Sequence, residues 1–326
     1  MSPTRVLFIG FQDLVSACYN DFLESIGGKC PVSLYDPSEA IADQMSDVRV
    51  VVDQGGWGTH TMVDAARVAG IDLWQVIGTG VDHLDVKYIL EKGITLANTP
   101  GIFSAVALAE HALFFIFCFA KNLHQSMENI RSGICFHPTN EELHNQTLGL
   151  IGFGASAREL TKRASALGMR ILAVDAAEVP RSVVDQYHLD FLGSTQDLPR
   201  LLEEADYLSL HAPLTSQTRH LVSDAAFRLM KPTAVLVNVA RGGIVDEDAL
   251  IRALQGGTIR GAGLDTFAHE PLDPLHPLLQ MKNVIATPHV AGATRATSRR
   301  RCQAAAENVF RIGNGLPPLY QVTAVE

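Results

Sequence analysis

Three polar residues in the second half of the chain each follow a short apolar run. Arg241 follows residues 235–240, Glu270 follows residues 262–269, and His289 follows residues 283–288. If these runs are parallel strands, their carboxyl ends open onto one crevice, where the three side chains converge. Arginine can hold a carboxylate through two hydrogen bonds, and histidine exchanges a proton near neutrality. A glutamate bonded to the far ring nitrogen fixes the tautomer and raises the histidine pKa, so the set predicts acid–base chemistry on a carboxylate.

Each of the three residues has a simpler explanation when it is taken alone. Glu270 stands before a proline, as turn residues often do, Arg241 precedes two glycines, and His289 follows a proline in a predicted loop. Their occurrence together, downstream of a glycine-rich turn, favours the functional explanation.

That glycine-rich turn lies in residues 148–157, an apolar strand that runs into G-x-G-x-x-A and then a helical pattern. Gly152 permits the tight turn, and Gly154 lets the backbone approach a pyrophosphate on the free N–H groups of the helix start. Ala157 replaces the third glycine where helix and strand pack closely. A similar turn occurs in methyltransferases that bind S-adenosylmethionine, but the residues further along argue against that class.

An acidic residue ends the next predicted strand. Asp175 stands 21 residues after Gly154, where it can accept hydrogen bonds from the ribose hydroxyls of a dinucleotide and repel a 2′-phosphate. No arginine follows in residues 176–178 to hold such a phosphate. The sequence therefore predicts NAD rather than NADP. The alternative is that Asp175 only caps a turn.

Composition excludes several classes of protein. The 326 residues carry 26 basic and 35 acidic side chains, a formal charge of −9, which argues against nucleic acid or an anionic membrane as the partner. An apolar fraction of 47% with 19% charged residues indicates a large core. Five scattered cysteines without a Cys-x-x-Cys pair indicate neither a metal site nor a disulfide framework. A reducing compartment, the cytoplasm, is expected.

Short apolar runs alternate with amphipathic stretches along nearly the whole chain, which predicts doubly wound parallel sheets. The expected strands are 6–9, 48–52, 74–77, 94–97, 148–151, 171–174, 207–210, 235–239 and 259–264. Expected helices include 59–69, 156–167 and 247–254, one long apolar helix from 102 to about 129, and a last helix from about 294 to 312. The most apolar part, 105–120, is too short to span a bilayer, and the N-terminus lacks a signal-peptide layout.

Taken together, the motifs resemble those of the D-isomer-specific 2-hydroxyacid dehydrogenase family. The resemblance runs from about Val76 to Thr294 and rests on six blocks: residues 77–85, 98–101 with 109–110, 148–157 with Asp175, 205–214 with Thr218, 230–232 with 238–243, and 288–289. It implies two doubly wound parallel-sheet domains. A Rossmann domain that binds NAD (residues 102–289) is expected as an insertion in a flavodoxin-like, substrate-binding domain (residues 1–101 and 290–326).

The resemblance also implies roles for matching residues. Arg241 would bind the substrate carboxylate and 2-oxo oxygen together with backbone groups at Thr79 and Gly80, His289 would be the general acid and base, and Glu270 its partner. The expected cofactor contacts are Gly152, Phe153, Gly154, Ala155, Ser156, Asp175, His211, Pro213, Thr218, Val239, Asp265 and Gly292. Family members usually pair as homodimers through the region of residues 102–119.

Two observations narrow the function further. Glu270 argues against formate dehydrogenase, a relative that pairs its histidine with glutamine. Residues 51–57 hold no basic side chain where phosphoglycerate-specific members bind phosphate, and Asp53 is expected to face that position. A small unphosphorylated 2-oxo acid such as hydroxypyruvate or glyoxylate is therefore expected. The rival hypothesis is a non-catalytic NAD(H)-sensing protein, as in the corepressors of this family, which keep the same residues.

Overall fold

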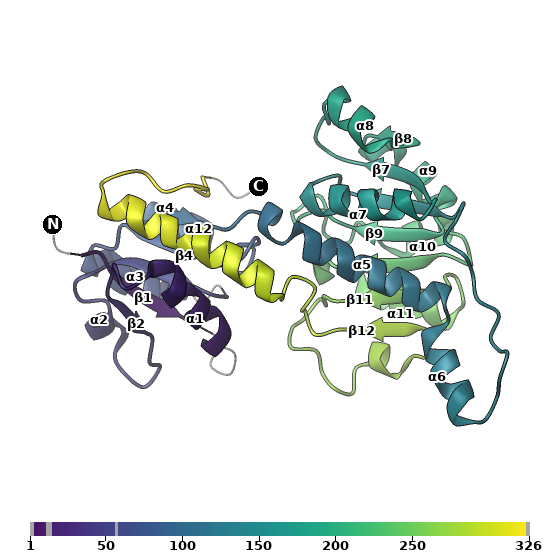
Figure 1. Ribbon diagram of the computed structural model, residues 1–326, viewed down its shortest axis with the longest axis horizontal. Coiled ribbons are helices and arrows are strands. Elements are labelled where there is room, and N and C mark those ends of the chain that lie inside the picture. Colours follow the sequence, from purple (N-terminus) through teal and green to yellow (C-terminus); the bar gives the residue numbers. More distant parts are fainter. Residues whose placement is uncertain (1–2, 11–14, 56–57, 324–326) are drawn as a thin grey trace. The chain divides into compact units, whose positions relative to one another are not determined.

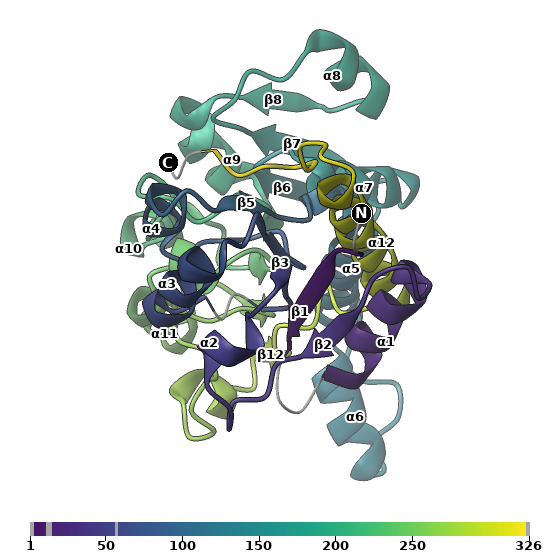
Figure 2. The ribbon, with the colours of Figure 1, turned by 90° about the vertical axis from the view of Figure 1, so that its left-hand side faces the viewer.

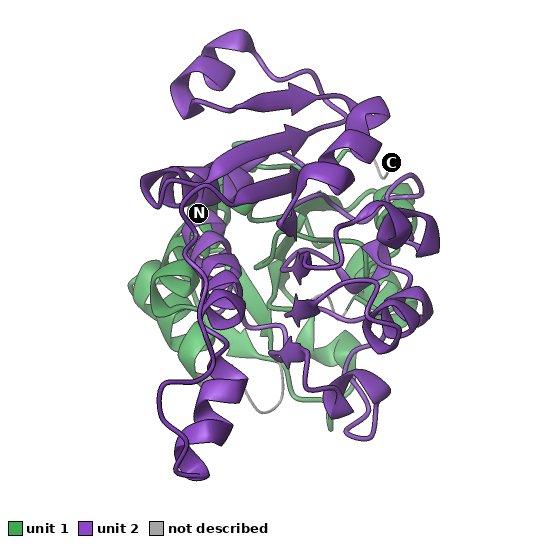
Figure 3. Ribbon diagram, turned by 90° about the vertical axis from the view of Figure 1, so that its right-hand side faces the viewer, with its two compact units in different colours: residues 1–103, 294–326 green, residues 104–293 purple. Residues whose placement is uncertain are grey.

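A computed structural model describes residues 3–10, 15–55 and 58–323 (Figure 1). The chain divides into two compact units. One contains residues 1–103 and 294–326, and the other residues 104–293 (Figure 3). The second unit is therefore an insertion in the chain of the first, and we call them the terminal unit and the inserted unit.

The terminal unit is built on a five-stranded sheet in which every strand pair is parallel. Its strands are β1 (Arg5–Ile9), β2 (Val32–Leu34), β3 (Val48–Asp53), β4 (Leu73–Val76) and β5 (Thr95–Ala97). Their spatial order is β2-β1-β3-β4-β5, which is the flavodoxin-like order. The β-branched and leucine-rich runs expected as strands form the buried centre of this sheet.

Helices cover both faces of this sheet (Figure 2). They are α1 (Val15–Ile26), α2 (Ile41–Gln44), α3 (His60–Ala69), α4 (Val86–Glu91) and α12 (Arg295–Gly313), with a 3₁₀ turn at Gly101–Phe103. Apolar residues of α1 and α12 pack with Val6 and Phe8 on one face. Those of α3 and α4 pack with Leu7 and Ile9 on the other. The alternate residues of β1 thus point to opposite helix layers, as the pleat of a strand requires.

The inserted unit holds a seven-stranded parallel sheet. Its strands are β6 (Thr147–Ile151), β7 (Arg170–Val174), β8 (Phe191–Gly193), β9 (Tyr207–Leu210), β10 (Val235–Asn238), β11 (Gly261–Leu264) and β12 (Val284–Ala286). The order β12-β11-β10-β9-β6-β7-β8 is that of a Rossmann fold with one added strand. The chain reverses its direction of winding between β6 and β9, and ligands of such sheets bind at that point.

Two helix layers enclose this second sheet (Figure 1). Its helices are α5 (Ala105–Ala120), α6 (Leu123–Arg131), α7 (Ala155–Ala166), α8 (Arg181–Tyr187), α9 (Leu198–Glu204), α10 (Asp224–Leu229) and α11 (Glu247–Gln255). Three 3₁₀ turns lie at Thr195–Asp197, Gly242–Ile244 and Pro277–Gln280. Residues of α5 and α7 share one core, and residues of α9, α10 and α11 share the other.

The single helix expected from residue 102 to about 129 is wrong. The chain forms α5 and α6 with a bend of 51° between them, because Asn122 takes a left-handed conformation with φ of 45°. Asparagine tolerates this conformation better than most residues. No single helix in the described ranges is long and apolar enough to cross a membrane, although α5 and α6 together meet the length and composition test as a bent pair.

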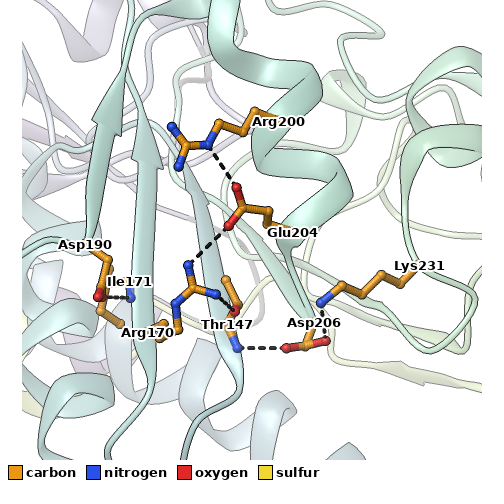
Figure 4. A network of polar contacts seen from close by, with 8 residues as sticks. All are labelled: Thr147, Arg170, Ile171, Asp190, Arg200, Glu204, Asp206 and Lys231. Carbon is orange, nitrogen blue, oxygen red and sulfur yellow. Dashed lines mark hydrogen bonds and ion pairs between the residues drawn. The ribbon is translucent and has the colours of Figure 1, made fainter.

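Charged residues bind one another at the amino-terminal edge of the second sheet (Figure 4). Asp206 accepts hydrogen bonds from the Thr147 N–H at 2.8 Å and from Lys231 Nζ at 2.7 Å. Glu204 accepts from Arg170 at 3.2 Å and from Arg200 at 2.9 Å. These contacts join the starts of β6, β7 and β9, at the edge opposite the strand ends where a ligand is expected.

Candidate active site

Gly152 directly follows β6 and has a conformation that only glycine adopts without strain. Its φ is 87°, and a Cβ atom there would lie 2.9 Å from the backbone N of Ala212 and from the backbone C of His211. The turn after β6 therefore touches the segment after β9, at the point where the winding reverses. Both the positive φ and the close approach exclude a side chain.

The first turn of α7 has the features that a pyrophosphate requires. Gly154 is its N-cap, and no side chain caps the turn. The leading N–H groups of a helix lack intrahelical partners. A Cβ on Gly154 would meet nothing within 4 Å, so the space next to this residue is open. The Asp175 carboxylate lies beside the turn, where it accepts from the N–H of Phe153 at 2.6 Å and of Ala177 at 2.8 Å. These residues fit a dinucleotide.

His211 links this turn to the neighbouring strand. Its Nδ1 lies 2.9 Å from Ser156 Oγ on α7, and its Nε2 lies 2.9 Å from Ser209 Oγ on β9. Burial lowers the pKa of His211 to about 4, so the ring is neutral at physiological pH. Further along, the Thr218 hydroxyl donates to the Pro213 carbonyl at 2.6 Å. The structure thus brings Ser156 and His211 together, and likewise Pro213 and Thr218.

Arg241 follows β10 on a turn whose backbone is fixed from both sides. Asn238 donates to the Arg241 carbonyl at 2.9 Å and accepts from the Ala240 N–H at 3.0 Å. The next residue, Gly242, packs so tightly on residues 267 and 268 that a Cβ would lie 1.9 Å from the Phe267 carbonyl carbon. Only glycine therefore lets the Arg241 turn lie against the segment that leads to Glu270.

Glu270 and His289 form a short, oriented pair. Glu270 Oε2 lies 2.6 Å from His289 Nδ1, and its Oε1 accepts from the Phe267 N–H at 2.9 Å. Burial alone raises the Glu270 pKa, but the bonds from His289 and Phe267 and the charge of Arg241 together lower it. The ionised carboxylate can only accept, so His289 carries a proton on Nδ1. Its Nε2, without a hydrogen-bond partner among the described residues, is left to exchange a proton.

The loop that carries His289 is held by Asp265, a residue with 0% exposure at the end of β11. The Asp265 carboxylate accepts from the N–H groups of Val290 at 2.9 Å and Ala291 at 2.8 Å, and its carbonyl accepts from the His289 N–H at 2.8 Å. The predicted contact of Asp265 with the nicotinamide stays a prediction. Its bonds to this loop could not be predicted from the sequence, because the partners lie about 25 residues away.

Two other predicted cofactor residues lie near these segments. Val239 is buried directly after β10. Gly292 lies against α5, where a Cβ would stand 3.5 Å from the Leu108 side chain. No group of three or more His, Cys, Asp or Glu side chains in the described part of the chain could hold a metal ion.

Thr79 and Gly80 belong to the terminal unit, in the loop after β4. The Thr79 carbonyl accepts from Asn98 Nδ2 at 2.7 Å, and its hydroxyl accepts from Arg301 on α12 at 3.2 Å. Of the other arginines on α12, Arg300 donates to the Phe103 carbonyl and Arg299 lies 3.7 Å from Asp21. All three of these α12 arginines therefore have partners within their own unit.

The prediction that Asp53 faces the place of a substrate phosphate is wrong. Its side chain has 0% exposure and accepts from Trp74 Nε1 at 3.0 Å and the Gly55 N–H at 3.1 Å. Asp53 therefore anchors a tryptophan instead of facing a ligand. The prediction of an unphosphorylated substrate then depends only on the composition of residues 51–57, of which positions 56 and 57 lie outside the described residues.

The two doubly wound sheets, the glycine turn and the Glu270–His289 pair define the class of dinucleotide-dependent dehydrogenases. A family model described as "D-isomer specific 2-hydroxyacid dehydrogenase, NAD binding domain" matches residues 113–291. The chain belongs to this family, and it is an NAD-dependent D-2-hydroxyacid dehydrogenase.

Individual proteins show the same relationship. A glyoxylate reductase of Korarchaeum cryptofilum is 36% identical over 246 residues, 73% of this chain and 72% of that protein. A D-3-phosphoglycerate dehydrogenase of Methanocaldococcus jannaschii is 34% identical over 298 residues, 90% of this chain and 55% of its own length. The solved D-isomer specific 2-hydroxyacid dehydrogenase of Lactobacillus delbrueckii ssp. bulgaricus, in an NAD-complexed form, has a TM-score of 0.81 and 26% identity, with 98% of this chain and all of that chain covered.

Proposed function

We propose that the protein interconverts a small, unphosphorylated 2-oxo acid, such as hydroxypyruvate or glyoxylate, and its D-2-hydroxy acid, with His289 as the general acid and base. The observation that carries this proposal is the 2.6 Å contact between Glu270 and His289, with Arg241 close enough to lower the Glu270 pKa. The three groups supply proton exchange, orientation of the ring and a positive charge in one place.

The direction of proton transfer follows from the hydrogen bond at Nδ1. Because Glu270 holds the Nδ1 proton, Nε2 is the nitrogen that protonates the oxygen on C2 during reduction and accepts the proton during oxidation. Glu270 stays ionised and stabilises the imidazolium form. Arg241 holds the substrate carboxylate in a two-bond contact, with backbone N–H groups at Thr79 and Gly80 as further donors.

The inserted unit is proposed to hold the cofactor and the terminal unit to bind the substrate. Residues 152–156 would receive the pyrophosphate, and Asp175 the adenosine ribose, with a contribution from the segment His211 to Thr218. Bound NADH supplies the hydride for C2. Asp175 supports NAD over NADP because its charge repels a 2′-phosphate.

The choice of an unphosphorylated substrate depends on residues 51–57, which contain no lysine, arginine or histidine. A phosphate dianion in that region would lack the cation that such a group normally requires. The name of the Korarchaeum relative agrees with a small 2-oxo acid, whereas the name of the Methanocaldococcus relative points to a phosphorylated one. The substrates must therefore be compared directly.

We further propose a homodimer that acts in the cytoplasm. Apolar side chains are exposed along α5, α6 and the segment after them: Phe114 is 45% exposed, Ile130 68% and Phe136 99%. Exposed apolar residues in such number on one run of chain are typical of a surface that another subunit covers. The measurement is sedimentation of the wild-type protein and of Ile130→Glu, which should shift toward a monomer.

The catalytic proposal is tested by NADH oxidation with glyoxylate, hydroxypyruvate, pyruvate and phosphohydroxypyruvate. We expect the highest kcat/KM with glyoxylate or hydroxypyruvate. His289→Ala should lose about 100-fold or more in kcat, as expected when a general acid is removed, with NADH binding retained. His124→Ala, which changes an exposed histidine on α6, is the matched control.

Three outcomes would contradict parts of this proposal. Full turnover by His289→Ala would show that His289 is not the general acid and base. A kcat/KM for phosphohydroxypyruvate far above the others removes the substrate class. Tight NADH binding with no turnover on any 2-oxo acid would instead support the NAD(H)-sensing hypothesis.

A further inference from the structure

We propose that His111 on α5 is a positioning residue for His289 and acts through Thr287 and Asp265. The inference depends on the proposed role of His289 as general acid and base. It extends that role to a chain of three side chains that do not themselves touch the substrate.

The His289 loop needs such support because its backbone is strained. His289 has a φ of 54°, a left-handed conformation that strains a residue other than glycine. Its N–H donates to the carbonyls of Asp265 at 2.8 Å and Thr287 at 3.0 Å. The Asp265 carboxylate binds the next two N–H groups, at Val290 and Ala291. The place of the imidazole therefore depends on where the Asp265 side chain is held.

A third donor holds the same carboxylate. Thr287 Oγ1 lies 2.6 Å from Asp265 Oδ1, and His111 Nε2 lies 2.9 Å from Thr287 Oγ1. An ionised carboxylate can only accept, so the single hydroxyl hydrogen of Thr287 points to Asp265. The Thr287 oxygen must then accept a hydrogen from His111 Nε2. The chain of donors runs in one direction, from His111 to Thr287 to Asp265.

The surroundings of His111 fix its ring. It makes an edge contact with Phe115, with ring centroids 4.8 Å apart, and its side chain is 18% exposed. Burial lowers the His111 pKa, although the charge of Asp265 opposes this effect. Its neighbours Ala109, Ala112, Phe115 and Ile116 are buried and apolar. A polar ring among them would lose water without compensation unless it made a hydrogen bond, and the bond to Thr287 is that compensation.

Paired variants separate the hydrogen bond from the packing. His111→Leu removes the donor, whereas His111→Gln keeps an N–H that can reach Thr287. Thr287→Val and Thr287→Ser form the same contrast one step along the chain. We expect the two variants without a donor to lose about 10-fold in kcat, because a small displacement of an acid has a large effect on rate. The two that keep it should recover most of the loss.

Three further measurements distinguish positioning from a general loss of structure. NADH affinity, measured by fluorescence, should stay within about twofold in all four variants. The solvent deuterium isotope effect on kcat should rise in His111→Leu and Thr287→Val, since proton transfer becomes slower. In the His289→Ala background, His111→Leu should cause no further loss. His124→Leu, on the exposed side of α6, should change none of these values.

The results that overturn the inference are distinct from those that overturn the proposed function. Wild-type kcat and an unchanged isotope effect in both His111→Leu and Thr287→Val would overturn it. So would equal losses in the donor-keeping and donor-lacking variants, since packing alone would explain them. If His111→Leu does not fold, the Thr287 pair decides. Full activity of His289→Ala would instead overturn the function itself.

Discussion

The two edges of the seven-stranded sheet carry the same types of charged side chain, but these side chains have different roles. At the amino-terminal edge, Asp206, Lys231, Glu204 and Arg170 bind one another or the backbone (Figure 4). At the carboxyl edge, Arg241, Glu270 and His289 lie near each other, and the 2.6 Å pair leaves the outer nitrogen of His289 for exchange.

This difference shows how a sheet separates stability from chemistry. Charges at the first edge hold the starts of strands together, so their loss should lower stability and leave turnover intact. Charges at the second edge are fixed by hydrogen bonds to loops that follow separate strands, so their loss should lower turnover far more than it lowers stability. Substitutions at each edge can break or sharpen this contrast.

After that of His289→Ala, the largest effect is expected at Arg241. Arg241→Lys keeps the charge but loses the planar two-bond contact with a carboxylate, so KM for the 2-oxo acid should rise about 10- to 100-fold. The melting temperature should stay the same. Steady-state kinetics and thermal unfolding measure both, with Arg252→Lys, in an exposed ion pair with Asp224, as the control. An unchanged KM would remove Arg241 from substrate binding.

The next largest effect is expected from substitutions in the glycine turn at the carboxyl edge. Gly152→Ala introduces strain at a φ of 87° and a contact with the backbone after β9, so it should weaken NADH binding at least about 10-fold and lower the melting temperature. Gly154→Ala meets open space, so it should keep the melting temperature while its methyl group impairs NADH binding. Equal melting temperatures for the two variants would contradict this assignment.

A smaller effect, on stability alone, is expected at the amino-terminal edge. Asp206→Ala leaves the Thr147 N–H and Lys231 without their acceptor, a loss of about 1–3 kcal/mol in the free energy of unfolding. Urea unfolding measures this loss. The kcat and KM values at a temperature well below the transition should equal those of the wild type. A fall in kcat without a fall in stability would show that the two edges are not separate.

The smallest effect concerns pH. The Glu270 pKa is lower in the folded protein than its ordinary value, so ionised Glu270 adds stability above the unfolded value of about 4.3. This stability disappears as the pH falls through the lower, folded value. The difference in melting temperature between the wild type and Glu270→Gln should therefore be largest near neutrality and shrink below about pH 4. A difference that stays constant down to pH 3 would contradict the assigned pairing.

Much of the fold could be predicted because its central strands are buried on both faces. Apolar runs such as 148–151 and 235–238 leave few alternatives once helices alternate with them. The edge strands β2 and β8 were missed because they are three residues long and have no fully buried residue. The break at Asn122 was missed because neither proline nor glycine marks it. The only sign of this break in the sequence is the pair of polar residues Lys121 and Asn122, which interrupts the apolar pattern.

The site shows the same division between local and distant information. The glycine turn and Asp175 could be found because their spacing along the chain carries the pattern. The bonds of Asp265 to the His289 loop, and that of Thr287 to His111 across 176 positions, are set by tertiary structure. A histidine inside a helix whose residues are apolar except for Glu110 and His111 was the one hint of the latter. Asp53 was misplaced because composition does not tell whether a carboxylate points inward.

The insertion of one unit into the other affects the order in which the two units can fold during synthesis. Residues 104–293 are continuous, so this unit can fold as soon as it leaves the ribosome. The terminal unit cannot be completed until α12 has been synthesised, because α12 packs against α1. The Sγ atoms of Cys302 and Cys18 lie 3.6 Å apart, although the two residues are separated by 284 positions in the chain. Such distant contacts form slowly. The first sheet to be synthesised is thus the last to be finished, and until then its α12-facing surface is open to chaperones and proteases.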